Sequence, residues 1–364
     1  MKLRRPTNRT VALAACAAAG AVFCYGGFVV WESSRAITES AGEIASESQI
    51  AFEARNPEAA AAPPFEWISS PAAFRDGALF DGSLFLAGAT RIVEYQPDGD
   101  VRRQFRVGLD LPAAPPAAMA AGLSTEAGKQ ALYVATAGEG LLVIGGSAEG
   151  RGVRQVRPVE RDFRDLTAVL PLATGRVLAG AEKKGVLVYD GNSWATFHSS
   201  LSDFHVTALA GTESDLWIGT LDRGVYHWTA GTPRQFTDRE GLPDPQVLSI
   251  AVDGQSAYVG TPMGVAEFRD GRFAREMARG TLAKTLLVRD RRLLIGTLDE
   301  GVIEVALDVR PPRGPRPVTG SEPGQAGNAI ERLIALEGEV YALAGDGVYQ
   351  RGVRHYDEGP TETT

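Results

Sequence analysis

Short apolar runs alternate with polar turns over most of this chain. The stretches "LWIGTLDRGVYHW" (216–228) and "LLIGTLDEGVIEV" (293–305) show the pattern most clearly. Each has a β-rich run, a turn that ends in glycine, and a second run in which apolar positions alternate. Two strand-like runs joined by such a turn predict a β-hairpin.

The hairpin pattern recurs along the sequence. Five more stretches match it: "LFLAGATRIVEY" (84–95), "LYVATAGEGLLVI" (132–144), "VLAGAEKKGVLVY" (177–189), "AYVGTPMGVAEF" (257–268) and "VYALAGDGVYQ" (340–350). The mean spacing is about 43 residues, the length of one four-stranded propeller blade. We therefore expect an all-β fold, a seven-bladed β-propeller of four-stranded blades over residues 65–358. Six or eight blades remain alternatives, because the first two repeats and the last are the least regular.

The segments beside the hairpins predict the other two strands of each blade. A nearly continuous apolar run precedes several hairpins (206–211, 247–252, 285–290 and 332–337). Such a run is typical of a strand buried on both faces. A polar turn and an aromatic strand follow at 192–198, 233–238 and 272–277. Either 352–358 or 65–69 would supply the outermost strand that closes the ring.

Glycine has a structural role in this repeat. Each turn glycine is expected to take a positive φ, which only glycine adopts at low cost. Gly219 and Gly296 are expected to leave room for a neighbouring blade. The turn glycines are Gly140, Gly185, Gly224, Gly264, Gly301 and Gly347.

The amino terminus carries a membrane-anchor pattern. Residues 1–10 hold Lys2, Arg4, Arg5 and Arg9 without an acid, and residues 11–31 contain no charged residue. About 20 such residues cross a bilayer as a helix, and the basic flank stays in the cytoplasm. We expect a single-pass anchor in a bacterial inner membrane, with the propeller in the periplasm or outside the cell.

Two other interpretations of the amino terminus remain open. One is a cleaved signal peptide, and the other is a lipoprotein signal that ends at Cys16. Residues 32–64 are expected to form a short juxtamembrane helix and an Ala/Pro linker, and residues 359–364 a disordered tail. Anchor and stalk could support weak dimerisation.

Charge and cysteine content narrow the function. The formal net charge of −8 argues against a nucleic-acid partner. The two cysteines, Cys16 and Cys24, both lie in the anchor segment, so no disulfide can staple residues 65–358.

Catalytic and metal-binding motifs are missing from the sequence. The four histidines lack metal-ligand spacing, and there is no nucleophile elbow or phosphate loop. We therefore expect no cofactor, no metal site and no enzymatic activity. A hydrolase or lyase with a site at the channel mouth is a lesser alternative, since carboxylates from different blades could converge there.

Binding is the favoured function, and the loops of one face are the expected site. In a four-stranded blade, the turn between the second and third strands lies on the same face as the connection to the next blade. Loops on a rigid scaffold often carry binding residues. The candidates are Asp162, Arg164, Asp165, Asp203, His205, Asp222, Arg223, Asp238, Arg239, Asp244, Asp299 and Glu300.

The repeat resembles the two-component regulator propeller repeat. The match is carried by "EGLPDPQVLSIAVDGQSAYVGTPMGVAEFRDGRF" (240–273) and "SSLSDFHVTALAGTESDLWIGTLDRGVYHW" (199–228). The resemblance implies an extracytoplasmic sensor-type propeller, although the output domain usual in that family is missing from this sequence. We expect a sensor-like or scaffolding module that binds an envelope protein. A small-ligand sensor that signals through a separate partner is the alternative.

Overall fold

The computed structural model describes residues 66–67, 74–96, 100–124, 129–147, 150–308, 316–317, 329–336, 339–344 and 347–351. The predicted anchor (11–31), the linker (32–64) and the tail (359–364) lie outside these residues. Within the described part, no helix is long and apolar enough to span a membrane.

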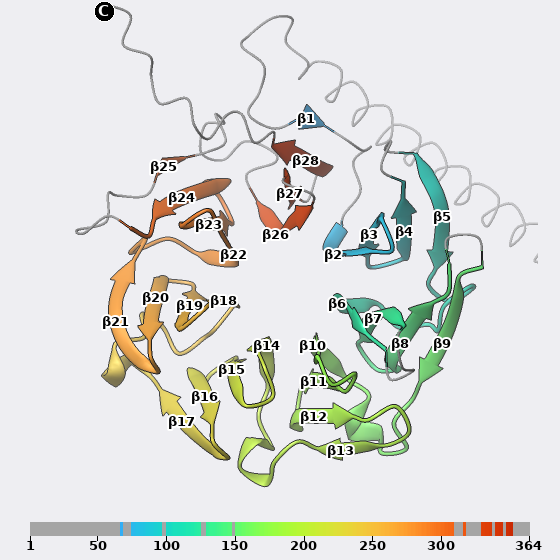
Figure 1. The fold of residues 1–364 in the computed structure, drawn as a ribbon, viewed down its shortest axis with the longest axis horizontal. Helices are drawn as coiled ribbons and strands as arrows, with labels where there is room; N and C mark the ends of the chain where they lie inside the picture. Colours follow the sequence, from blue (N-terminus) through green and yellow to red (C-terminus); the bar gives the residue numbers. More distant parts are fainter. Residues whose placement is uncertain are drawn as a thin grey trace, which may run out of the picture. The chain divides into compact units, whose positions relative to one another are not determined.

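The described strands form seven antiparallel sheets of four strands each, placed around a common axis (Figure 1). The first three blades are β2 (Phe74–Phe80), β3 (Ser83–Gly88), β4 (Arg91–Tyr95), β5 (Val101–Arg106); β6 (Pro116–Leu123), β7 (Gln130–Thr136), β8 (Gly140–Gly145), β9 (Gly152–Val156); and β10 (Leu166–Pro171), β11 (Val177–Ala181), β12 (Gly185–Tyr189), β13 (Trp194–Thr196). The next three are β14 (Val206–Gly211), β15 (Asp215–Thr220), β16 (Val225–Thr229), β17 (Thr232–Phe236); β18 (Ser249–Asp253), β19 (Ser256–Thr261), β20 (Gly264–Arg269), β21 (Arg272–Met277); and β22 (Ala283–Arg289), β23 (Arg292–Thr297), β24 (Val302–Ala306), β25 (Arg316–Pro317).

The last sheet combines the two ends of the propeller. Strands β26 (Ile330–Leu336), β27 (Glu339–Ala344) and β28 (Gly347–Arg351) are completed by β1 (Glu66–Trp67). Glu66 pairs with Gln350 and Trp67 with Tyr349. Of the two closures that the sequence left open, the structure shows the one by 65–69. Ring closure by an early strand ties the first residues of the propeller to the last.

The core lies between blades and not within them. The described residues form seven clusters of buried apolar side chains, and each combines residues from two neighbouring blades. One example joins Leu178 of β11 to Leu216 and Ile218 of β15. A single blade has no core of its own, so the blades stabilise one another as the repeat pattern predicts.

Glycine in the second strand of a blade makes room for the next blade. A Cβ on Gly219 would lie 2.5 Å from Val247, and one on Gly296 would lie 2.7 Å from Ile330. Gly180 has the same relation to Val206. The expected packing role of these glycines is therefore confirmed.

The turn glycines also behave as predicted where the structure gives their φ. Gly224 has φ 73° and Gly301 has φ 72°, and Gly140, Gly185 and Gly264 are positive as well. A Cβ on Gly224 would lie 2.1 Å from the carbonyl oxygen of Phe236. Any side chain at this position would therefore clash and would also strain the backbone.

The innermost strands share one irregularity. In six blades the pairing of the first and second strands shifts by one residue at the same point of the repeat. The unpaired residues are Arg75, Ala117, Thr167, Thr207, Lys284 and Glu331. A bulge redirects the side chain of its extra residue, and here each lies on a strand beside the central axis (Figure 1).

In the part of the chain that the structure describes, three of the connections between blades contain a short 3-10 helix. They are η1 (Arg161–Phe163), η2 (Ser199–Leu201) and η3 (Asp238–Glu240). Helix η2 follows strand β13, and this strand is shorter than the sequence predicted. We expected a strand over 192–198, but β13 ends at Thr196, because His198 instead accepts a hydrogen bond from the backbone of Ser200 and caps η2.

Candidate partner-binding face

Hydrogen bonds place the hairpin turns and the blade connections on one face of the ring, here called the turn face. The backbone N–H groups of Gly138 and Gly140 both donate to the carbonyl of Arg164, in the connection to the next blade. In the following blades Gly185 donates to Phe204, and Leu221 donates to His205. The turns of blades two and three are thus fixed against the connection that leaves their own blade, and Leu221 fixes its turn against the connection that enters blade four.

A threonine at the end of the second strand holds the turn in shape in several blades. Its hydroxyl donates to the carbonyl of the turn glycine in four blades: Thr136 to Gly140 (2.7 Å), Thr220 to Gly224 (2.6 Å), Thr261 to Gly264 (2.8 Å) and Thr297 to Gly301 (2.8 Å). These threonines are fully buried. The threonine and the turn glycine therefore belong to the frame of the turn, and the residues between them differ from blade to blade.

Two predicted site residues meet at a lysine that the sequence analysis did not single out. The ammonium of Lys184 lies 3.7 Å from a carboxylate oxygen of Asp162 and 3.6 Å from one of Asp203. Arg223 donates to the backbone carbonyl of Asp203 and lies over the ring of Phe204. All three charged side chains at Lys184 are partly or largely exposed, so these ion pairs stabilise the fold little. Lys184 occupies the same place in its turn as Arg223, which is the signal that could have identified it.

The remaining candidates lie on the same face but form no single cluster. Asp244 accepts a hydrogen bond from the backbone of Gln246, the local role that the sequence suggested for it. Arg164 donates to the carbonyls of Pro158 and Val159. His205 is half-buried, and its carbonyl accepts from Leu221. Exposed candidates without a side-chain partner among the described residues are Asp222, Asp238, Arg239, Asp299 and Glu300.

The connection between the fourth and fifth blades is fixed by a capping box. The hydroxyl of Thr237 accepts from the backbone of Arg239, while the Glu240 carboxylate accepts from the backbone N–H and hydroxyl of Thr237. These hydrogen bonds hold the pKa of Glu240 below its usual value. Asp238 and Arg239 are therefore presented from a locally ordered segment.

The innermost strands add charged side chains near the axis. The Lys284 ammonium pairs with Glu331 of the next blade at 2.5 Å, and Arg332 pairs with Asp76 at 3.0 Å. Asp76 also accepts from the backbone of Met119 at 2.7 Å. These contacts link the last two blades, the first and the second. Arg75 is exposed and has no side-chain partner in the described part of the chain.

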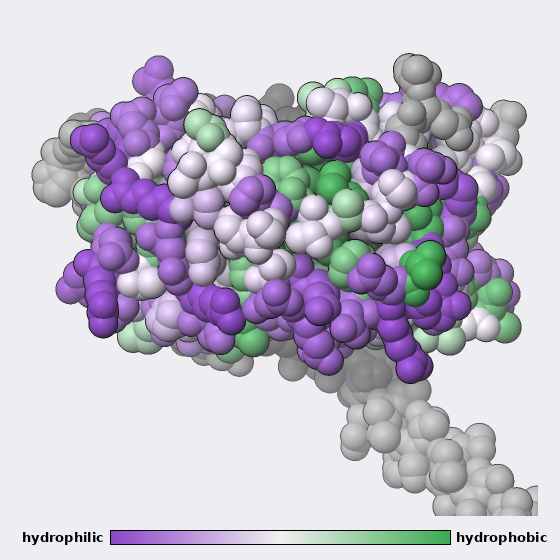
Figure 2. All heavy atoms as spheres, turned by 90° about the horizontal axis from the view of Figure 1, so that it is seen from below, coloured by the Kyte–Doolittle hydropathy of each residue, from purple (hydrophilic) through white to green (hydrophobic). Residues whose placement is uncertain are grey.

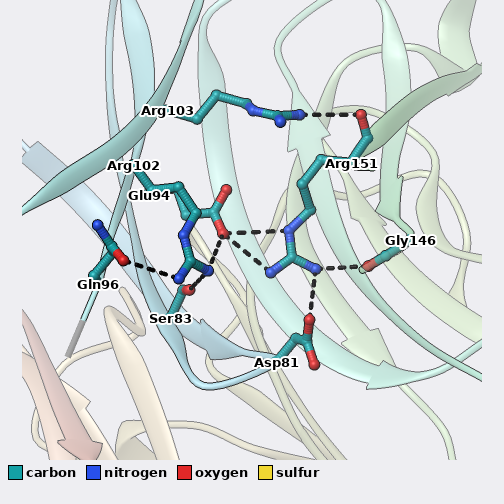
Figure 3. A network of polar contacts seen from close by, with 8 residues as sticks. All are labelled: Asp81, Ser83, Glu94, Gln96, Arg102, Arg103, Gly146 and Arg151. Atoms are coloured by element: carbon teal, nitrogen blue, oxygen red, sulfur yellow. Dashed lines mark hydrogen bonds and ion pairs between the residues drawn. The ribbon is translucent and has the colours of Figure 1, made fainter. Parts of the chain in front are cut away.

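A buried ionic network joins the first two blades (Figure 3). The guanidinium of Arg151 donates twice to Glu94, at 3.0 and 3.3 Å, and also to Asp81 and to the carbonyl of Gly146. The side chains of Arg151 and Glu94 are fully buried. Each charge therefore depends on the other for its stability. The network's role is structural, because it closes a boundary between blades.

The rim of the ring is mostly hydrophilic where blades three and four face outward. Figure 2 views this side, and polar side chains separate the apolar areas from one another. Among the described residues, no group of three or more His, Cys, Asp or Glu side chains could hold a metal ion.

Comparison with known proteins supports the fold. No family model and no curated protein matches the chain. Among solved structures it is similar to the extracellular domain of a hybrid two-component system from B. thetaiotaomicron (14% identity, TM-score 0.59, 78% of this chain and 40% of that one). It is also similar to the extracellular domain of a one-component system from the same organism (14%, TM-score 0.61, 80% and 42%).

These similarities establish a β-propeller and no more. Raptor from Chaetomium thermophilum matches about as well, at 12% identity and a TM-score of 0.59, over 79% of this chain and 29% of that one. The chain spans less than half the length of these three proteins. A shared propeller does not determine function.

Proposed function

We propose that this chain is a non-enzymatic binding module, held at a bacterial inner membrane by residues 11–31, with its propeller outside the cytoplasm. It binds a protein partner of the cell envelope through its turn face and acts as a sensor-like or scaffolding module. The extracellular sensor domains among its structural neighbours support this placement.

One observation carries the proposal. The buried threonines and the turn glycines hold the backbone of the turn face, and the exposed charged and apolar side chains between them are not part of these hydrogen bonds. A rigid frame that presents exposed, variable residues is what a binding surface requires.

Crosslinking in native membranes followed by mass spectrometry tests the proposal. We expect the wild-type chain to recover a partner, and the variant with alanine at Asp203, His205, Asp238 and Asp244 to lose it at matched folded fraction. A control variant carries alanine at Asp253, Gln255 and Arg272 in the opposite-face turns, and it should keep the partner. Equal recovery by all three chains would place the contact elsewhere.

A small-ligand sensor is the second candidate, and the axial bulges favour it. Arg75 and the Lys284–Glu331 pair are polar groups placed near the channel by the same irregularity in different blades. A screen of anionic metabolites by thermal shift tests this candidate. Stabilisation by a ligand that disappears in Arg75→Ala would favour it, and stabilisation unchanged by that substitution would count against it.

A further inference from the structure

Three consecutive blades expose a large apolar side chain in the turn between their second and third strands. The exposed fractions are 42% for Leu221, 52% for Met263 and 47% for Leu298. Leu221 and Leu298 directly follow the frame threonine, and Met263 directly precedes the turn glycine. Hydrogen bonds from Leu221 to the His205 carbonyl and from Gly280 to the Met263 carbonyl place the first two turns on the turn face, and Leu298 lies in the corresponding turn of the next blade.

The turns of the first three blades present different residues. They contain Ala89 and Thr90, then Ala137 to Glu139, then Glu182 to Lys184, and none is a large apolar residue. The threonine-to-glycine bond is present both in blade two and in blades four to six. The frame of the turn therefore does not require leucine or methionine at these positions.

The apolar turns lie among unpaired acids. Asp222 neighbours Leu221, Asp299 and Glu300 follow Leu298, and Asp238 lies in the connection between the fourth and fifth blades. All four carboxylates are exposed, and the described residues offer none of them a side-chain partner. The bases nearby are fewer: Arg279 pairs with the Glu276 carboxylate, whereas Arg223, which bonds to the neutral Asp203 carbonyl, and Arg239 have no carboxylate partner among the described residues.

We propose that the turn face of blades four to six binds a basic, apolar segment of a partner polypeptide. Leu221, Met263 and Leu298 would contact its apolar side chains, and the surrounding carboxylates would pair with its Lys or Arg residues. The proposal rests on the proposed function and names the chemistry of the partner. An acid excess around apolar contacts favours a basic partner and disfavours an anionic membrane surface.

Selection of random 12-residue peptides on the purified full-length chain tests the proposal. We expect enrichment of sequences that combine Lys or Arg with large apolar residues. Their affinity should fall about tenfold or more in the variant L221Q/M263Q/L298Q. It should also fall in D222N/D299N/E300Q and at high salt, because exposed charge pairs are screened.

A matched control exists on the opposite face. Val101 (47% exposed), Leu123 (42%) and Val252 (37%) lie next to turns at the other end of the strands. The variant V101Q/L123Q/V252Q removes similar apolar surface and should bind the selected peptides like wild type. A parallel measurement uses vesicles of phosphatidylcholine and phosphatidylglycerol.

Four results would overturn the proposal. They are an absence of enriched peptides, enrichment of sequences without basic residues, equal binding to L221Q/M263Q/L298Q, or vesicle binding that this variant loses. If L221Q/M263Q/L298Q still crosslinks to the partner of the wild-type chain, this surface is not the contact, but the proposed binding function remains supported. If the wild-type chain crosslinks to no partner, that result contradicts the proposed function itself.

Discussion

Neighbouring blades must fill the space between them, and two boundaries of this ring do so in different ways. One lies between blades one and two, and the other lies between blades four and five. In the first, Glu94 of the third strand is buried against Arg151 of the next blade. In the second, His227 occupies the same position of the repeat, stacked on Trp217 at 4.0 Å and bonded to Asp215 at 2.6 Å. Phe236 and Phe268 complete the second boundary.

This difference shows which parts of the repeat are fixed. The four-stranded blade is common to the whole described ring, and the frame threonines recur in blade two and in blades four to six, whereas boundary side chains and turn residues change. A propeller needs a filled space between blades, and either a buried ion pair or packed aromatic rings can fill it. The same freedom applies to the turn face, where blades four to six carry leucine and methionine.

The largest predicted effect comes from breaking the ionic boundary. Arg151→Met leaves Glu94 buried without its main partner, which should cost about 3–5 kcal/mol of unfolding free energy. Urea denaturation of the full chain measures it.

The double variant E94Q/R151M is the control for that prediction, since it removes both charges and should be less destabilised than R151M alone. A loss below about 1 kcal/mol in R151M would show that the ionic boundary contributes little.

The next effect tests the shared frame. Gly224→Val should cost about 1–3 kcal/mol from backbone strain alone, and the contact with the Phe236 carbonyl adds to it. Gly231→Val is the matched control, because Gly231 also has a positive φ but no atom lies within 4 Å of its Cβ position. Equal melting temperatures for the two variants would contradict the role assigned to the turn contact.

Much of the fold could be predicted from sequence, and particular residues show why. Period-two alternation and glycine at fixed offsets determine hairpins locally, so the positions of Gly219 and Gly224 could be inferred from sequence. The ring closure by Glu66 and Trp67 could not, because either terminus offered a suitable strand. Ionic pairing of Arg151 with Glu94 joins residues 57 positions apart, and no local pattern signals it.

For the candidate site, the sequence predicted which face of the propeller carries it but not which residues contact one another. Knowing the blade topology places Asp162, Asp203 and Arg223 on one side of the ring. Their contacts with Lys184 and the Asp203 carbonyl depend on how neighbouring blades are rotated, which sequence spacing does not give. The exposure of Leu221 and Leu298 was also missed, because apolar residues inside a repeated motif suggest a buried position.

A smaller effect on stability is expected when the exposed apolar residues of the turns are replaced and the turn frame is left intact. The variant L221Q/M263Q/L298Q should change the unfolding free energy by no more than about 0.5 kcal/mol per site, as expected for exposed positions. Urea denaturation beside V101Q/L123Q/V252Q makes the comparison. A loss of several kcal/mol only in the turn-face variant would show that these side chains support the fold.

The smallest effect concerns the pH dependence of the capping box. The pKa of Glu240 is lowered by the hydrogen bond from the Thr237 backbone and by the one from its hydroxyl. Ionised Glu240 therefore stabilises the fold above its unfolded pKa of about 4.3, and this contribution is lost as the pH falls through the folded pKa. We expect the melting temperature of wild type minus that of Glu240→Gln to shrink between about pH 6 and pH 3. A difference that grows on acidification would contradict the assignment.

Amide hydrogen exchange on the full chain, with and without a selected basic, apolar peptide, tests the central claim most directly. The claim is that partners bind to the turns of blades four to six. It predicts slower exchange at 220–224, 261–264 and 297–301, with no change at 137–139, 182–184 or the opposite-face turn at 253–256. Protection confined to the first three blades or to the opposite face would contradict it.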